Sequence, residues 1–268
     1  MNDYKQKLEI SIRAAVSAGN ILKKHSEDTL HLTRVKKESF RDITTEADIY
    51  AEENIVKILR EADQSPIISE EAGIIGVLDE KKGYWVVDPL DGTVNYANHI
   101  PFCAVSIAYM ENMVPVVGVI YNPFTNELFY GARGLGVYKN HRRISIVDRS
   151  PEEALFAVTF SGKKHDTDRD KEFKVFSEVN DRTMGCLRTG AAALNLAYVA
   201  EGRMGGCFGR LSRIWDIAAG ILLAELAGAV VTLEVDKKDH SLATYSVLVP
   251  KSQHFLEDIL ALIYGKEK

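Results

Sequence analysis

Helical and strand-like hydrophobic patterns alternate along almost the whole of this 268-residue chain. Apolar residues recur at spacings of three and four over residues 8–22, which predicts a first amphipathic helix. Runs rich in β-branched and aromatic residues follow at 102–110, 114–121 and 127–132, separated by turn residues, and they predict an antiparallel meander. With 46% hydrophobic residues the chain has ample material for a core. The pattern predicts a globular α+β protein.

The character of the chain changes near Pro151, and this predicts two halves, 1–150 and 151–268, that pack around a shared cleft. The first half contains a polar segment, 36–42, which we expect to be a loop. A Thr-x-x-Asp pair at Thr45 and Asp48 predicts the start of a second helix. The other expected elements are strands at 67–69, 84–87, 154–160, 229–234 and 243–249, and helices at 168–179, 190–200, 215–227 and 252–264.

Composition and charge narrow the class of protein. The 38 acidic residues outnumber the 33 basic ones, which argues against nucleic acid as a partner. Three cysteines without a CxxC pair and seven histidines without HxH or HExxH spacing make disulfide scaffolds and zinc sites poor interpretations. No signal peptide or apolar run of about 20 residues is evident. We therefore expect a cytoplasmic protein with no membrane partner.

The most informative motif lies at residues 85–95, where an apolar strand runs directly into two carboxylates, Asp88 and Asp91. Acids at the carboxyl end of a strand occupy the usual position of an α/β active site. Gly92 lets the backbone approach a ligand closely, and the amides of Gly92 and Thr93 would point at an anion where a short helix begins. The motif predicts a site for an anion beside a carboxylate pair.

Two further segments place acids beside apolar elements. Glu70 and Glu71 follow the strand at 67–69, and Asp216 opens an apolar helix. Each acid also has a purely structural interpretation, because Asp216 would suit a helix N-terminus and Asp88 and Asp91 would suit a turn. Taken singly these interpretations hold, but they do not explain why acids end or begin apolar segments at three separate places.

The combined pattern resembles the inositol monophosphatase family, one of the lithium-sensitive, magnesium-dependent phosphatases that include fructose-1,6-bisphosphatases. The resemblance is carried by Asp-Pro-Leu-Asp-Gly-Thr-x-Asn at 88–95, Glu-Glu at 70–71, Trp-Asp-x-Ala-Ala-Gly at 215–220 and Asp-Ile-Thr-Thr-x-Ala-Asp at 42–48. It implies a layered α-β-α-β-α sandwich, a homodimer, and hydrolysis of a small soluble phosphate ester.

The resemblance also implies roles for particular residues. Glu70, Asp88 and the Leu90 carbonyl would bind one Mg²⁺, and Asp91 and Asp216 would join Asp88 around a second. Thr93, with Asp42 nearby, would orient the attacking water. Because the 36–42 segment is charged and has no apolar anchor except Phe40, we further hypothesise that it closes over a third, weaker metal held partly by Glu70. Serine stands at position 69, where relatives usually have glycine, and because serine is small we expect little effect on metal binding.

Physical chemistry supports a metal site independently of the resemblance. The set offers only oxygen ligands, which Mg²⁺ prefers. Two like charges ~4 Å apart cost about 4 kcal/mol at an effective dielectric near 20. Four gathered carboxylates are therefore tolerable only with bound cations or with raised pKa values. Two metal ions would polarise the phosphoryl group, activate water and neutralise the leaving alkoxide.

Three other motifs have weaker claims. Asp91-Gly92-Thr93 also resembles the motif of aspartyl-phosphate-forming phosphatases, but Pro89 stands where their nucleophile would be. Cys207 and Arg213 have the spacing of cysteine phosphatases, yet Cys207 reads better as a small buried hydrophobe on a strand. The glycines at 131–136 fit a hairpin turn better than a dinucleotide loop.

The sequence says less about the substrate. We expect the leaving group to contact Asp91, Asp216 and residues of the second half, namely Arg188, Gly190, Ala191, Arg210 and Arg213. Inositol-selective members of the family typically carry an acid seven positions before the Trp-Asp aspartate, and this chain has Gly209 there.

Two explanations of Arg210 and Arg213, which lie near Gly209 in the sequence, stay open. They could favour a substrate with a second anionic group, such as fructose 1,6-bisphosphate or adenosine 3′,5′-bisphosphate, or they could simply pair with surface acids. A different class also stays open, an inactive metal-binding regulatory relative, although the intact set of site residues argues against it.

Overall fold

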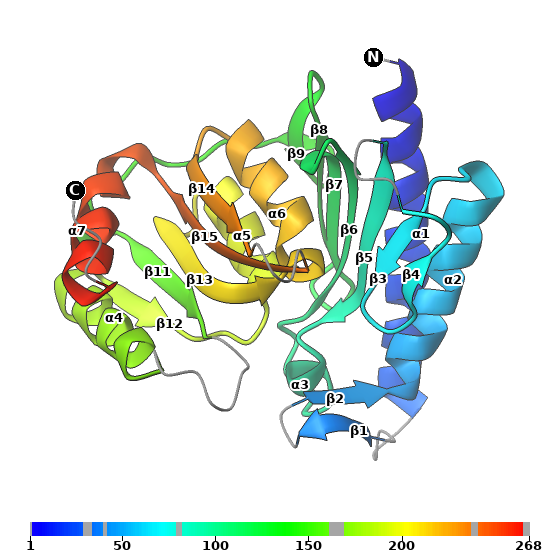
Figure 1. Ribbon diagram of the computed structural model, residues 1–268, viewed down its shortest axis with the longest axis horizontal. Helices are drawn as coiled ribbons and strands as arrows, with labels where there is room; N and C mark the ends of the chain where they lie inside the picture. The colour runs from blue at the N-terminus through cyan, green and yellow to red at the C-terminus, as the bar shows by residue number, and fades with distance from the viewer. Residues whose placement is uncertain are drawn as a thin grey trace.

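Two β-sheets and three layers of helices alternate in the order α-β-α-β-α (Figure 1). The computed structural model describes residues 2–28, 34–39, 42–78, 82–160, 169–236 and 241–264. Three hydrophobic clusters fill the spaces between these layers. The α+β sandwich predicted from the sequence is confirmed.

The first sheet has eight strands in the order β10-β9-β8-β7-β6-β5-β3-β4. Neighbouring strands of this sheet pair antiparallel, except for β3 and β5, which run parallel to each other. The strands are β3 (Ile67–Ser69), β4 (Gly73–Ile75), β5 (Tyr84–Asp91), β6 (Ala104–Glu111), β7 (Val114–Asn122), β8 (Glu127–Ala132), β9 (Gly136–Lys139) and β10 (Arg142–Arg143). The meander predicted from the β-branched runs is therefore present, with β8 and β9 joined by the expected hairpin turn.

Helices α1 (Asn2–Asp28) and α2 (Glu46–Ala62) cover the outer face of this sheet. Leu8, Ala15 and Leu22 of the predicted stripe are buried against it. Gly19 lies where α1 crosses the sheet, and a side chain there would collide with the ring of Tyr121, because a Cβ atom would stand 2.5 Å from Tyr121 Cε1. The apolar stripe and Gly19 therefore determine how closely α1 packs against the first sheet.

The second sheet has five strands in the order β12-β11-β13-β15-β14. Strands β12, β11 and β13 run parallel, and β15 and β14 are antiparallel to their neighbours. The strands are β11 (Leu155–Thr159), β12 (Gly185–Leu187), β13 (Gly206–Arg213), β14 (Val230–Val235) and β15 (Leu242–Leu248). Cys207 is a buried residue of β13, as expected.

Helices α5 (Ala192–Ala200) and α6 (Ile214–Leu226) lie between the two sheets, whereas α4 (Arg169–Arg182) and α7 (Gln253–Tyr264) cover the far side of the second sheet (Figure 1). Almost every residue of α5 is buried, because sheets lie on both sides of the middle layer. Short helices also occur at Thr93–Tyr96 (α3), Pro151–Glu153 (η1) and Pro250–Ser252 (η2). Within the described part of the chain, no helix has the length and apolarity that crossing a membrane requires.

The segment expected to be a loop at 36–42 is in part a β-hairpin, and this corrects the prediction. Strand β1 (Arg34–Ser39) pairs antiparallel with β2 (Asp42–Thr45), while residues 40 and 41 lie outside the described part. The strand was missed because Arg-Val-Lys-Lys-Glu-Ser carries neither an apolar alternation nor a run of β-branched residues.

Candidate active site

Parallel pairing of β3 with β5 brings the first two predicted metal ligands together. Ser69 lies opposite Val87, and the Glu70 amide donates to the Val87 carbonyl at 3.2 Å. Glu70 and Asp88 therefore follow paired residues at the same edge of the sheet. The Leu90 amide donates to Asp88 Oδ1 at 2.8 Å, which turns the backbone so that Asp91 is also presented at this edge.

Gly92 makes the tight turn from β5 into α3 possible. Its φ is +91°, a conformation that side chains disfavour. A Cβ atom there would stand 3.0 Å from the Phe102 carbonyl oxygen and 3.1 Å from Cys103 Cβ. Asn95, in α3, donates to the Phe102 carbonyl at 2.7 Å and to the Thr189 carbonyl at 2.9 Å. The predicted turn thus also connects the first half of the chain to the second.

Helices of the middle layer supply the other side of the site. The Ala193 amide, at the start of α5, donates to Asp91 Oδ2 at 2.7 Å. Asp216 lies in the first turn of α6, whose position is fixed by a 3.1 Å hydrogen bond from the Ser106 hydroxyl to the Trp215 carbonyl. Both acids therefore meet the edge of the first sheet at helix N-termini, where the backbone dipole favours negative charge.

A cavity of about 170 Å³ lies where these elements converge. All four carboxylates predicted as metal ligands line it. The lining residues are Ile43, Glu70, Asp88, Leu90, Asp91, Gly92, Thr93, Val94, Gly190 and Asp216. Residues far apart in the chain thus face one space, as the sequence pattern predicts.

The predicted substrate-binding arginines and Ala191 are not in this lining. The Arg188 guanidinium lies 5.5 Å from the centre of the Phe160 ring. Arg210 Nε lies 3.9 Å from the buried Glu172 carboxylate. Arg213 lies over the Trp215 ring, 5.4 Å from its centre. Their contacts with a substrate stay predictions.

Asp42 occupies the first position of β2, and its side chain lies outside the described part of the structure. Its catalytic role therefore stays a prediction.

The electrostatics of the cavity reflect its crowding with acids. Burial raises the pKa of Asp88 well above its ordinary value, and the charges of Glu70, Asp216 and Asp91 raise it further. Burial and the Asp216 charge raise the pKa of Asp91, although the Ala193 amide opposes the shift. Burial raises the pKa of Asp216 to about 7, against the pull of the neighbouring Arg213. Such a cluster gains stability when a cation neutralises it.

The donor set fits a hard divalent cation by chemistry. It consists of four carboxylates and the Leu90 carbonyl, which together offer oxygen only. In the positions that the described side chains take here, no group of three or more histidine, cysteine or acidic residues stands ready to hold an ion. Cation binding would therefore draw the carboxylates inward around the cavity that they already share.

Asp48 is a site residue that the sequence analysis identified only as a helix cap. Its Oδ2 accepts a 2.9 Å hydrogen bond from the Thr45 amide, while its Oδ1 lies 3.0 Å from the Thr93 hydroxyl. That hydroxyl also lies 3.0 Å from the Leu90 carbonyl oxygen, and its single proton can be donated to either acceptor. Burial raises the pKa of Asp48 to about 6. The sequence did hold a signal for a role of Asp48 in the site, because Asp48 is the last residue of the 42–48 stretch that carries part of the family resemblance.

Comparison with known proteins decides the family. The model of the inositol monophosphatase family matches residues 3–266. The chain belongs to this family. The Nus factor SuhB of Xylella fastidiosa is 37% identical over 85% of this chain and 82% of its own. The fructose-1,6-bisphosphatase/inositol-1-monophosphatase of Aquifex aeolicus is 34% identical over 87% of this chain and 88% of its own.

Solved structures of the family agree with the fold. The extragenic suppressor protein SuhB of Bartonella henselae is 33% identical and superposes with a TM-score of 0.85, covering 94% of this chain and 97% of its own. Because the likeness extends over nearly the whole of both chains, the middle helix layer and both sheets belong to the shared fold. The inositol monophosphatase family is a metal-dependent phosphatase family, which agrees with the acid-lined cavity.

Proposed function

We propose that this chain is a magnesium-dependent phosphatase that hydrolyses a small phosphate monoester by direct attack of water. The observation that carries the proposal is the single cavity lined by Glu70, Asp88, Asp91 and Asp216. Glu70, Asp88 and the Leu90 carbonyl would hold one Mg²⁺, and Asp88, Asp91 and Asp216 a second. Bound there, the ions supply Lewis acidity toward the phosphoryl oxygens and a water of lowered pKa.

The residues around the cavity have complementary tasks. The amides of Gly92 and Thr93 lie at the start of α3 beside the cavity, and they would donate to phosphate oxygens. When the Thr93 hydroxyl donates to Asp48, its lone pairs are free to accept a proton of the attacking water. The deprotonated Asp48 would therefore fix the direction of the Thr93 hydroxyl and, through it, the position of the water. Asp42 stays a further candidate for this task.

Direct attack has a stereochemical consequence. Water would form the new P–O bond as the bond to the leaving alkoxide breaks, so the configuration at phosphorus would invert. Among the residues lining the cavity there is no cysteine, serine or histidine, and in this proposal the acids are engaged as metal ligands and Thr93 in orienting the water. Trapping a phosphoenzyme, or finding retention with a chiral phosphate ester, would contradict this mechanism.

The leaving group would extend from the catalytic cavity past Gly190 toward the second half of the chain. Position 209 is occupied by glycine, and a side chain there would collide with the Tyr245 ring, because a Cβ atom would stand 2.4 Å from Tyr245 Cε1. Position 209 therefore offers no acid to the hydroxyl groups of a polyol. We propose a bisphosphate of a sugar or nucleoside as the alternative to an inositol phosphate, and a homodimer as the assembled form.

A second candidate is a regulatory role without turnover. Relatives that bear the name Nus factor SuhB match this chain as closely as those named for a phosphatase. The complete set of cavity acids nevertheless favours catalysis, because a chain kept only for partner binding has no use for four gathered carboxylates, of which Asp88, Asp91 and Asp216 have raised pKa values.

Phosphate release with Mg²⁺ tests the proposal. The substrates should be inositol 1-phosphate, fructose 1,6-bisphosphate, adenosine 3′,5′-bisphosphate and histidinol phosphate. We expect turnover of at least one ester that is abolished by EDTA and reduced more than about 100-fold in Asp91→Asn, because that variant loses a ligand of the second metal. Absence of metal-dependent turnover with all four esters would favour the regulatory role.

A further inference from the structure

Glu52 of α2 is a buried acid that lies outside the catalytic cavity, with only 5% of its surface exposed. Its Oε1 accepts hydrogen bonds from two consecutive backbone amides, Glu71 N at 3.0 Å and Ala72 N at 3.1 Å. The hydroxyl of Ser69, which is 1% exposed, donates to the same oxygen. One carboxylate oxygen thus gathers three donors from the chain on either side of Glu70.

These contacts fix the turn that carries a predicted metal ligand. Residues 70–72 form the turn between β3 and β4, and Glu70 is its first residue. On the strand side the Glu70 amide is anchored to the Val87 carbonyl, beside Asp88. On the other side the Glu52 carboxylate holds the two amides that follow. The backbone of Glu70 is therefore restrained from both directions.

The same turn is connected to the β1–β2 hairpin. The hydroxyl of Thr44, in β2, lies 3.1 and 3.2 Å from the two carboxylate oxygens of Glu71. Thr44 is itself buried, and its neighbour Ile43 lines the catalytic cavity. Glu71 therefore directs its side chain toward the hairpin, and unlike Glu70 it is not among the residues that line the cavity.

We infer that Glu52 and the Ser69 hydroxyl are positioning residues for Glu70, and that they set the affinity of the cavity for its divalent cation. This inference rests on the proposed function, because it takes Glu70 to be a metal ligand. It revises the expectation that serine at position 69 has little effect. Serine adds a third donor to the Glu52 carboxylate, which glycine at this position would lack. Groups that orient a metal ligand commonly change metal affinity by about 10- to 100-fold when they are removed.

Mn²⁺ binding to the full-length protein, measured by isothermal titration calorimetry, tests the inference without requiring turnover. We expect Ser69→Ala to weaken Mn²⁺ binding about threefold to tenfold and Glu52→Ala more than about tenfold. Glu52→Gln keeps an acceptor oxygen for the three donors and should bind within about threefold of wild type. In the assay of phosphate release, the half-saturating Mg²⁺ concentration should rise in parallel, with kcat at saturating Mg²⁺ little changed.

Two controls separate the possible failures. Ser11→Ala removes a buried hydroxyl whose only described hydrogen bond is to the Lys7 carbonyl of α1, and it should bind Mn²⁺ as wild type does. Glu70→Gln should weaken binding strongly. If Glu70→Gln binds normally, the proposed metal site itself is wrong. If Glu70→Gln is weakened while Ser69→Ala matches Ser11→Ala, the positioning role is wrong, and this comparison decides the matter even if Glu52→Ala does not fold.

Discussion

Asp48 uses its two carboxylate oxygens for different purposes. Oδ2 accepts a hydrogen bond from the Thr45 amide and so caps the N-terminus of α2. Oδ1 lies at hydrogen-bond distance from the hydroxyl of Thr93, which lines the cavity. A capping interaction that can be recognised in the sequence therefore also orients a side chain 45 positions away. Local helix chemistry and the catalytic geometry depend on one residue.

This double role predicts the behaviour of Asp48→Asn. The amide has one acceptor oxygen, and if that oxygen keeps the Thr45 amide, the NH₂ group faces the Thr93 hydroxyl and can only donate to it. The Thr93 proton must then turn to the Leu90 carbonyl, and one lone pair of the hydroxyl is occupied by the introduced NH₂ group. We expect kcat to fall about 100-fold or more, because the hydroxyl that orients water is held in the wrong direction. The half-saturating Mg²⁺ concentration should change little. Steady-state kinetics over a Mg²⁺ series provide the measurement.

Thr45→Ala is the matched control for this variant. It removes the hydroxyl that contacts Asp48 at the helix start but leaves the contact between Asp48 and Thr93. It should lower the free energy of unfolding by about 1 kcal/mol with kcat close to wild type. If Asp48→Asn, like Thr45→Ala, loses stability but keeps a normal kcat, Asp48 acts only as a cap.

Among the elements, those with strong periodicity were predictable and those without it were not. Helices α1 and α2 and strands β5 to β8 follow apolar stripes or β-branched runs. Cys207 was expected on a strand, but the bounds of β13 were not predicted, because Gly206 and Gly209 interrupt the strand and polar residues end it. The parallel pairing of β3 with β5, which unites Glu70 with Asp88, depends on contacts across the sheet that no local pattern records. The sequence therefore predicted the four acids that line the cavity, but the contact of Asp48 with Thr93 could be seen only in the structure.

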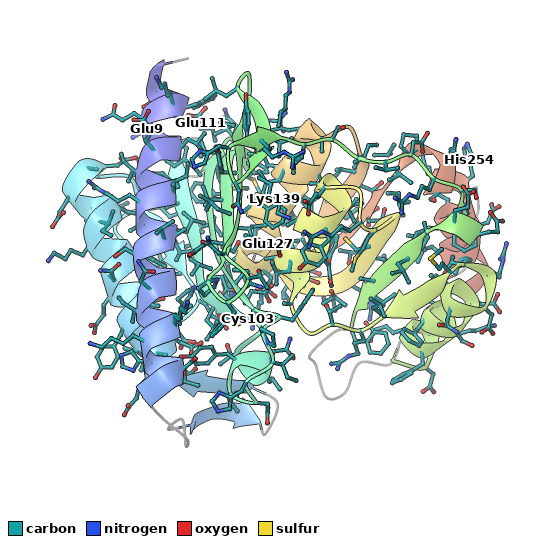
Figure 2. All side chains as sticks on the ribbon, turned by 180° about the vertical axis from the view of Figure 1, so that it is seen from behind. Glu9, Cys103, Glu111, Glu127, Lys139 and His254 are labelled. Atoms are coloured by element: carbon teal, nitrogen blue, oxygen red, sulfur yellow. The ribbon has the colours of Figure 1, made fainter. Side chains whose placement is uncertain are left out.

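An ion-pair cluster connects the meander to the middle helix layer. Glu127, at the start of β8, and Lys139, at the end of β9, lie close together (Figure 2) with Nζ 2.7 Å from Glu127 Oε1. Lys139 also contacts Glu201, just after α5, at 2.7 Å. Arg203 contacts both acids, and the Tyr198 hydroxyl donates to Glu127 Oε2 at 3.1 Å. The cluster holds the end of α5 against the first sheet.

The cluster makes a definite prediction about acid stability. Although burial opposes it, hydrogen bonds from Arg203 and Lys139 lower the pKa of Glu127 to about 2, from 4.5 in the unfolded chain. The unfolded state therefore binds more protons between these values, and the stabilisation is present above pH 4.5 and lost as the pH falls toward 2. Glu127→Gln should lower the free energy of unfolding by about 2 kcal/mol at pH 7.

Urea denaturation at pH 7 and pH 3 provides the test of the Glu127 cluster. The difference between Glu127→Gln and wild type should shrink at pH 3. The control is Glu225→Gln, which breaks the exposed pair with Arg133 and should change stability by less than about 0.5 kcal/mol at either pH. An equal, pH-independent loss in both variants would show that the cluster contributes no more than a surface ion pair.

At the scale of the whole molecule, the acids that line the cavity belong to different layers of the sandwich. Glu70, Asp88 and Asp91 come from the first sheet, whereas Asp216 comes from a helix of the middle layer. Folding therefore brings like charges together as it brings the layers together. Without cations, this repulsion opposes the packing that the hydrophobic clusters favour.

That opposition predicts how the metal-free protein responds to pH. Asp88, Asp91 and Asp216 have pKa values raised above the ordinary 3.8, to about 7 for Asp216, so the native state binds more protons than the unfolded state between these values. The stability that the raised values contribute is complete below about pH 3.8 and is lost as the pH rises through 7. In EDTA, Tm should fall by about 5 °C or more between pH 5.5 and 8.0. Adding Mg²⁺ at pH 8.0 should restore it, because cations neutralise the cluster.

Thermal denaturation followed by circular dichroism measures both effects, and Asp216→Asn should show a smaller fall and a smaller response to Mg²⁺. A metal-free protein whose Tm is unaffected by pH in this range and by Mg²⁺ would mean that the four carboxylates do not form one electrostatic unit.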